Sequence, residues 1–259
     1  MMKDKAMAIN EVFPNPVVKE VAFELRFPKL FFIESRIGEF QLLVMKDFPD
    51  SKLALQRQFI FAAGEDKTLQ DIAAGQKNEQ PEKIWQFTSS SGVRLSVMNS
   101  RLTLSSQTHK TYRFGDADRF RDVVASVTDK FFKIIAVPLI TRIGLRYIDA
   151  CPATSKTIEA FRSYYNSVLP LDRFPIEATN AMEFTTVVDR KGCKLRYVES
   201  LEVEPDVARL TLDFDAWSEN IEPAQVLTVT DSLHDTICDE FVKTIKEPVF
   251  TYMRKPKGT

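Results

Sequence analysis

Histidine and cysteine are scarce in this sequence of 259 residues. The two histidines, His109 and His234, are too few and too scattered for a metal site built on imidazole ligands. The three cysteines, Cys151, Cys193 and Cys238, are odd in number and lack paired spacing, which argues against a disulfide framework and a zinc ribbon. We therefore expect no metal and no other cofactor.

Long apolar runs and an excess of one charge are also missing. The longest apolar runs are far shorter than a bilayer-spanning helix, and residues 1–8 carry charge with no apolar stretch behind them, unlike a signal peptide. A net charge of −1 and a pI near 6.2 argue against a basic coat for general nucleic-acid binding, although a local basic patch remains open. These absences predict a cytoplasmic protein without a membrane segment.

The motifs of the commonest enzymes are absent as well. The sequence has no nucleophilic-serine motif, Walker sequence, dinucleotide glycine fingerprint or zinc-ligand spacing. Missing motifs do not exclude catalysis, but they favour a binding protein. Phenylalanine, in contrast, is abundant, with 20 copies against 2 tryptophans and 6 tyrosines. This excess fits a large core and equally a hydrophobic ligand cavity.

Two alternating stretches open similar halves of the chain. Residues 17–27 place apolar side chains on one face and Glu20 and Glu24 on the other, and residues 137–149 do the same with Arg142 and Arg146 on the polar face. Later matches follow in the same order: Arg101–Leu104 (Arg-Leu-Thr-Leu) recurs as Arg209–Leu212, and the Phe-x-Lys-x-Ile-x-x-Pro pattern of 131–138 recurs at 241–248. Chance similarity is the alternative to a repeat.

Periodicity predicts the order strand, helix, three or four strands and long helix in each half. In the first half the elements are 17–27, 32–47, 53–63, a polar loop over 64–83, 84–88, 93–97, 101–106 and a helix capped by Asp116 that ends before Pro138. In the second half they are 139–149, a helix ending before Pro170, 176–188, 193–203, 207–217 and a helix beginning at Pro223. The predicted class is α+β, with two tandem repeats, 12–137 and 138–253, that form a curved antiparallel sheet with helices on one face. The other face of this sheet, which carries the polar side chains, is expected to be concave and open.

This order of elements resembles the TATA-box-binding-protein fold and, more loosely, the helix-grip ligand-binding folds. At the level of sequence, Asn15–Phe27, Arg101–Leu104 and Arg142–Asp149 resemble a sporadically distributed prokaryotic family of uncharacterised proteins of about this length. The similarity covers nearly the whole chain, and Asp149 stands where asparagine is expected. It implies a cytoplasmic protein of unknown function and carries no catalytic residues with it.

Arginines dominate the predicted polar face of the sheet. Arg101, Arg142, Arg146 and Arg209 are the candidate ligand-binding residues, because arginine suits phosphate, carboxylate and nucleic acid. Neighbouring basic residues on the strands are Arg94, Lys194 and Arg196. The alternative is internal pairing, with Glu20 and Glu24 neutralising Arg142 and Arg146 and the acids of the last strand neutralising the rest, and the net charge near zero favours pairing.

A weaker acidic site is also conceivable. Asp213 and Asp215 share a strand face and, with Glu202, could hold Mg²⁺, although a solvated acidic face is the favoured interpretation. Glu199 falls in phase with apolar neighbours, which predicts an inward carboxylate that needs a partner, or a bulge. On the last helix, Asp231, His234 and Cys238 could bind a metal or act as acid and base, against the favoured alternative of a surface histidine beside a half-buried cysteine.

Together these patterns predict a non-enzymatic binding or interaction module that uses the polar sheet face around Arg142 and Arg146. A nucleic-acid-binding saddle is one rival, and it requires an uncompensated positive face. A second rival is a small-molecule binder or enzyme with a phenylalanine-lined cavity between helices and sheet, which requires a deep pocket with an ionisable group such as Glu199, Asp213 or Asp215. A homodimer formed through the open face is the third.

Overall fold

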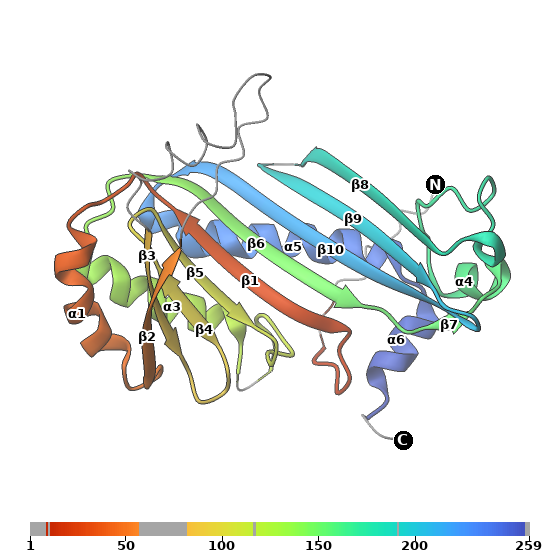
Figure 1. The fold of residues 1–259 in the computed structure, drawn as a ribbon, viewed down its shortest axis with the longest axis horizontal. Coiled ribbons are helices and arrows are strands. Elements are labelled where there is room, and N and C mark those ends of the chain that lie inside the picture. Colours follow the sequence, from red (N-terminus) through yellow and green to blue (C-terminus); the bar gives the residue numbers. More distant parts are fainter. Residues whose placement is uncertain (1–8, 10, 57–81, 116–117, 191, 257–259) are drawn as a thin grey trace, which may run out of the picture.

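The computed structural model describes residues 9, 11–56, 82–115, 118–190 and 192–256. These residues form five α-helices and one ten-stranded sheet in which each strand pair is antiparallel and which does not close into a barrel (Figure 1). The predicted α+β class is confirmed. No helix in these ranges is long and apolar enough to span a membrane.

The strands, in chain order, are β1 (Val18–Arg26), β2 (Asp50–Gln56), β3 (Glu82–Thr88), β4 (Arg94–Val97), β5 (Arg101–Ser106), β6 (Ile140–Ala150), β7 (Thr154–Ser155), β8 (Ala181–Arg190), β9 (Cys193–Val203) and β10 (Val207–Ile221). The helices are α1 (Ile33–Val44), α3 (Phe120–Ile134), α4 (Ile158–Tyr164), α5 (Val226–Thr244) and α6 (Glu247–Arg254). The sheet order is β2-β3-β4-β5-β1-β6-β10-β9-β8, with β7 paired to β10.

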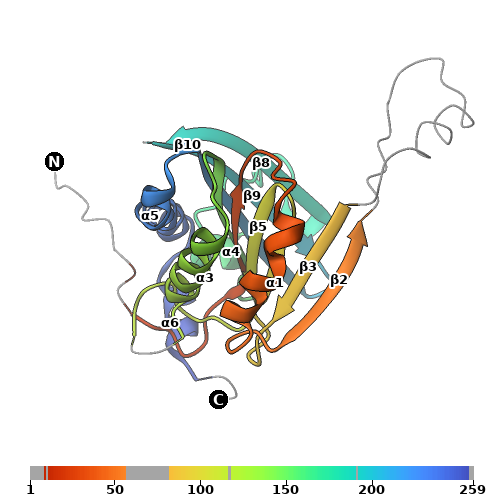
Figure 2. The ribbon, with the colours of Figure 1, turned by 90° about the vertical axis from the view of Figure 1, so that its left-hand side faces the viewer.

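Strands β1 and β6 lie side by side in the middle of the sheet. Val21 stands opposite Tyr147, and Phe23 stands opposite Leu145. Because paired residues share a face, the apolar sets of the two strands form one continuous surface. Helices α1, α3 and α5 lie on that side, and the sheet bends toward them (Figure 2). The polar face is therefore on the outside of the bend, in contrast to the concave open face of the predicted saddle.

Phenylalanine fills much of the core. Twelve of the phenylalanines that the structure describes are buried. Phe131 of α3 packs edge-on against Phe40 of α1 at 5.4 Å between ring centroids, and Phe27 lies 5.7 Å from Phe131. The abundance of phenylalanine is thus mainly a property of the core.

Several predicted boundaries differ from the structure. Residues 57–63 of the strand predicted over 53–63, the loop to residue 81 and the Asp116 cap lie outside the described residues. Residues Ile176–Ala178 form a 3₁₀ turn after Pro175, so β8 begins only at Ala181. Helix α4 ends at Tyr164, six residues before Pro170. Helix α6 was missed, because Pro248 reads as a helix stop although it occupies the first turn of a new helix, where no donor is needed.

Candidate functional site

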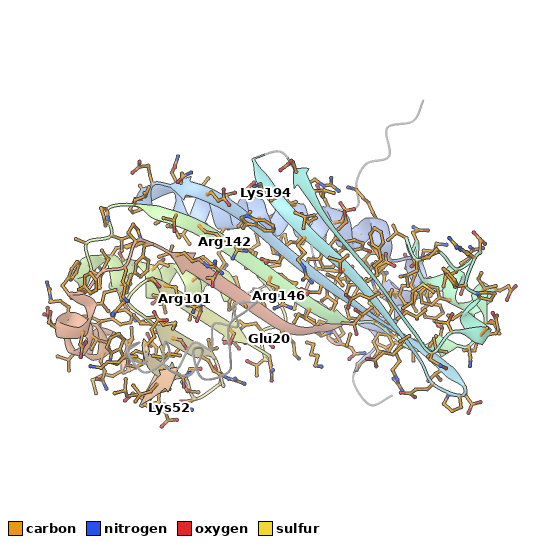
Figure 3. All side chains as sticks on the ribbon, turned by 45° about the horizontal axis from the view of Figure 1, so that its top comes forward. Glu20, Lys52, Arg101, Arg142, Arg146 and Lys194 are labelled. Atoms are coloured by element: carbon orange, nitrogen blue, oxygen red, sulfur yellow. The ribbon has the colours of Figure 1, made fainter. Side chains whose placement is uncertain are left out.

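The polar face of the sheet brings most of the predicted arginines together. Antiparallel pairing aligns Arg26 of β1 with Arg142 of β6, and Arg146 with Asp215 of β10. Asp215 in turn pairs with Arg196 of β9. Figure 3 shows labelled charged residues across this face, from Lys52 on β2 to Lys194 on β9.

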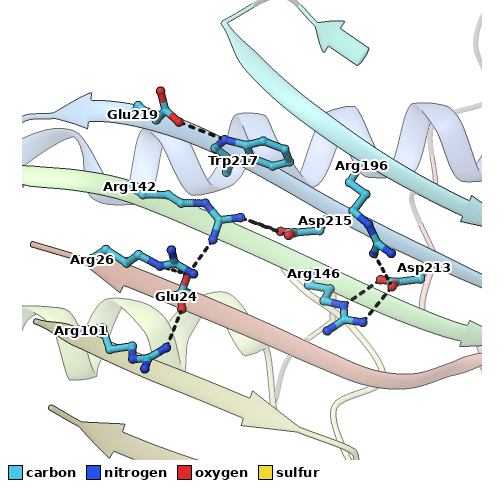
Figure 4. A network of polar contacts seen from close by, with 10 residues as sticks. All are labelled: Glu24, Arg26, Arg101, Arg142, Arg146, Arg196, Asp213, Asp215, Trp217 and Glu219. Atoms are coloured by element: carbon cyan, nitrogen blue, oxygen red, sulfur yellow. Dashed lines mark hydrogen bonds and ion pairs between the residues drawn. The ribbon is translucent and has the colours of Figure 1, made fainter. Parts of the chain in front are cut away.

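Glu24 is the centre of one group of ion pairs (Figure 4). It accepts hydrogen bonds of 2.7 Å from Arg142 Nη1 and from Arg26 Nε, and Arg101 Nη1 lies 3.9 Å from its other oxygen. Arg142 Nη2 also donates to Asp215 at 3.1 Å. This group, which we call the Glu24 group, therefore contains three arginines and two carboxylates.

Asp213 is the centre of a second group. Arg146 donates to both of its oxygens at 2.8 Å, and Arg196 donates at 3.0 Å. The bonds to Asp213 raise the pKa of Arg146. This Asp213 group contains two arginines and one carboxylate, so each group holds one more arginine than acid. Glu24 pairs with Arg142 as the internal-pairing alternative predicts, whereas Arg146 is held by Asp213 and not by Glu20.

Arg209 and the predicted acidic site stand apart from this arrangement. Arg209 pairs with Glu204 at 3.1 Å near the start of β10 and joins neither group. Asp213 and Asp215 do share one face of β10, but arginines occupy their oxygens. Among the described residues, no cluster of three or more histidine, cysteine, aspartate or glutamate side chains could hold a metal ion.

Glu199 points inward, as its phase on β9 predicts, and is fully buried. The hydroxyl groups of Ser167 and Tyr197 donate to its carboxylate, and the backbone N–H of Val168 donates at 3.1 Å. The carboxylate thus fastens the segment after α4 to the sheet. These bonds account for its burial as a structural group.

A small cavity lies on the opposite, helix-covered side, between β1, the end of β6, the 109–114 segment and α5. We call it the α5 pocket. Its volume is about 90 Å³, and its walls are largely apolar, with Phe13, Phe114 and Phe241 among them. It corresponds to the phenylalanine-lined cavity of the second rival prediction, although Glu199, Asp213 and Asp215 are not among its lining residues.

Asp149 is the buried carboxyl group of the α5 pocket. It is only 3% exposed, and its Oδ1 has no hydrogen-bond partner in the described part of the chain. Burial raises the pKa of this carboxyl to about 7. Sequence reasoning missed Asp149 as a site residue. A signal was present, because Asp149 alternates in phase with the inward-facing Ile143, Leu145 and Tyr147, and the same kind of signal on β9 identified Glu199.

His234 and Cys238 also line the α5 pocket. His234 is 7% exposed, so the interpretation as a surface histidine is wrong. Its ring stacks on Tyr112 at 4.1 Å, and its Nε2 lies 3.4 Å from Cys238 Sγ. Burial lowers the pKa of His234 and raises that of Cys238 to about 12, so neither is charged near neutral pH.

Asp231, the third member of that predicted trio, has a separate role at the pocket wall. It accepts the Tyr112 hydroxyl at 2.9 Å and a bidentate pair of bonds from Arg121 at 2.7 and 2.9 Å. These bonds attach the first turn of α3, through Arg121, and the segment before it, through Tyr112, to α5. The burial of His234 could not be predicted from helical spacing alone, because Tyr112, which covers its ring, lies more than a hundred positions earlier in the chain.

No known protein-family model matches this chain, and no curated protein matches it significantly. Candidate roles for the two sites therefore follow from their geometry.

Proposed function

We propose that this chain is a small-molecule-binding protein and that the α5 pocket is its binding site. The observation that carries the proposal is the Asp149 carboxylate, which is buried in an apolar cavity and has one oxygen without a partner among the described residues. Burial of a carboxylate without a partner destabilises a fold, and such groups are concentrated at functional sites. Glu199 is equally buried, but both of its oxygens accept hydrogen bonds, so its burial does not indicate a functional site.

The state of the neighbouring residues supports binding over catalysis. A nucleophilic cysteine requires a thiolate, whereas burial keeps Cys238 protonated. His234 is neutral and stacked on Tyr112, which restricts its ring. The pocket thus offers apolar walls and one buried carboxylate, the pattern of a ligand site with a single orienting group.

A cavity-filling variant tests the proposal. Val18 lies directly opposite Asp149 across the β1–β6 pair and lines the pocket, so Val18→Phe should fill it. Val187→Phe, on the exposed surface of β8, adds the same volume elsewhere. Titration with short amphiphiles, followed by ligand-observed NMR, should give binding to the wild type and to Val187→Phe but not to Val18→Phe. Equal binding by all three proteins would refute the pocket as the site.

We also propose that residues 12–137 and 138–253 are two copies of one unit. Two observations support this: the Arg-Leu-Thr-Leu motifs lie on β5 and β10, and these strands flank β1 and β6 respectively. Leu104 stands opposite Phe23, and Leu212 stands opposite Asp149. Asp149 thus occupies the position that a core phenylalanine has in the first half, which fits a function acquired by one copy. An experimental structure in which superposed halves did not align Leu104 with Leu212 would contradict the duplication.

The polar face is a second candidate, as a docking surface for an acidic partner such as nucleic acid. The specific observation is the extra arginine in each of the Glu24 and Asp213 groups. Arg26→Gln with Arg146→Gln removes two half-exposed charges while each acid keeps another arginine. Lys133→Gln with Lys243→Gln, on the helices, is the matched control.

Mixed short DNA and RNA, titrated at low and high salt, distinguish the outcomes for this face. Salt-sensitive binding that is weakened in the arginine variant and kept in the lysine variant would support docking. No binding at low salt would remove nucleic acid as the partner. Sedimentation of the same proteins would then show whether a second copy covers the face.

A further inference from the structure

The α5 pocket contains one buried charge. Three charged residues are among the lining residues that the structure describes: Glu11, Lys110 and Asp149. Glu11 is exposed and pairs with Arg254 at 2.7 Å, and Lys110 is also exposed. Asp149 alone is inside, so a ligand deep in the pocket meets an uncompensated carboxylate.

Several donors that line the pocket beside Asp149 have other partners. The Tyr112 hydroxyl donates to Asp231, and His109 Nδ1 lies 2.7 Å from Ser106 Oγ. His234 contacts Cys238 and lies 3.6 Å from Asp235. Oδ1 of Asp149 remains without a partner within the described ranges. None of the lining residues that the structure describes donates to Oδ1, so a ligand can supply this bond.

We propose that the α5 pocket binds small primary amines in their ammonium form, with the ammonium on Asp149 and the hydrocarbon part against the apolar walls. This inference rests on the proposed function of the pocket. An ammonium supplies both the positive charge and three N–H donors, and charge-assisted bonds of this kind are the strongest that a carboxylate makes. An anion would be repelled, and an uncharged ligand would leave the carboxylate without a counterion.

The cavity limits the size of the amine. At about 90 Å³ it is smaller than the engineered cavities of about 150 Å³ that take a benzene molecule. An unbranched alkyl chain is narrower than a ring, so short chains suit this narrow space better than ring systems do. Aromatic side chains nearby, including Tyr147 and Phe241, present surfaces that also tolerate a cation.

Three probes of nearly equal size test the charge requirement: n-butylamine, 1-butanol and propionate. Dissociation constants at pH 8 are measured by ligand-observed NMR for the wild type, Asp149→Asn and Val18→Phe. We expect n-butylamine to bind the wild type at least tenfold more tightly than 1-butanol, and propionate not to bind. Asp149→Asn should abolish that preference while 1-butanol binding persists, because the substitution removes the charge and keeps the shape of the side chain.

The outcomes separate the ligand class from the pocket itself. Equal affinity for n-butylamine and 1-butanol in the wild type, unchanged in Asp149→Asn but lost in Val18→Phe, would overturn the amine inference and leave the pocket as a binding site. Absence of binding by all three probes would count against both. A preference for n-butylamine that persists in Asp149→Asn would place the cation at another carboxylate and overturn the role of Asp149.

Discussion

Asp149→Asn should stabilise the protein at alkaline pH and change its stability little at acid pH. Asparagine has nearly the same shape as aspartate but carries no charge. The wild-type side chain is buried, and burial raises its pKa from an ordinary 3.8 to about 7. The folded state therefore holds this proton more tightly than the unfolded state does. As the pH rises through this window, the unfolded chain releases the proton first, and the wild type loses stability.

The magnitude follows from the width of the window. A difference of roughly 3 pH units, at about 1.4 kcal/mol per unit, amounts to about 4 kcal/mol. Typical domains have a total stability of about 5–15 kcal/mol, so the effect is large. The free energy of unfolding of Asp149→Asn should exceed that of the wild type by about 4 kcal/mol at pH 8, and the two should differ little at pH 4.

Urea unfolding of both proteins at pH 4, 6 and 8 provides the assay. Tyr147, Cys151 and Cys238, which interact electrostatically with Asp149, have raised pKa values and stay neutral across this range. Burial lowers the pKa of His234 in both proteins, so its contribution cancels in the comparison. Asp213 also acts on Asp149 from the opposite face but is unchanged. A difference that stays constant from pH 4 to pH 8 would refute the reasoning, because it would mean that Asp149 is already charged and paired.

Three further predictions concern the same structure. The affinity for n-butylamine should fall about 30-fold between pH 8 and pH 5.5, because a proton competes for Asp149 with its pKa of about 7, and NMR titration at the two pH values measures this. Glu199→Gln should lower the free energy of unfolding by about 2–3 kcal/mol through weaker bonds to Tyr197 and the segment after α4, and urea unfolding would contradict this if it gave no change. Asp231→Ala should cost about 1–2 kcal/mol and speed amide exchange in residues 109–114, since the bond to Tyr112 is lost. Unaltered exchange there would show that other contacts hold this wall.

Alternation of apolar and polar residues predicted the strands, because a half-buried strand directs every second side chain into the core. It also placed Arg142, Arg146 and Asp213 on a common face. The sequence could not reveal which arginine meets which acid, since register between strands depends on packing of the whole sheet. Thus Glu24 reaches Arg142 as expected, while Arg146 pairs across β10 instead of with Glu20.

The α5 pocket was harder to predict for a physical reason. A cavity exists where side chains from distant segments fail to fill space, and here these are β1, β6, the 109–114 segment and α5. Alternation marks Asp149 as inward, but it does not show that Glu199 finds donors and Asp149 does not. Two of the three donors to Glu199, Ser167 and Val168, lie more than thirty positions from it in the chain.

The central position of β1 has a consequence for synthesis on the ribosome. Its partners β5 and β6 begin only at Arg101 and Ile140, so the first strand of the chain must wait for most of the first half, and then for the start of the second, before both of its edges are paired. In a nascent chain that ends before Ile140, β1 has an unpaired edge, and it carries the apolar side chains of Val21, Phe23 and Leu25. Such edges pair with other chains. The same placement that shelters these residues in the finished protein makes the half-made one prone to aggregate.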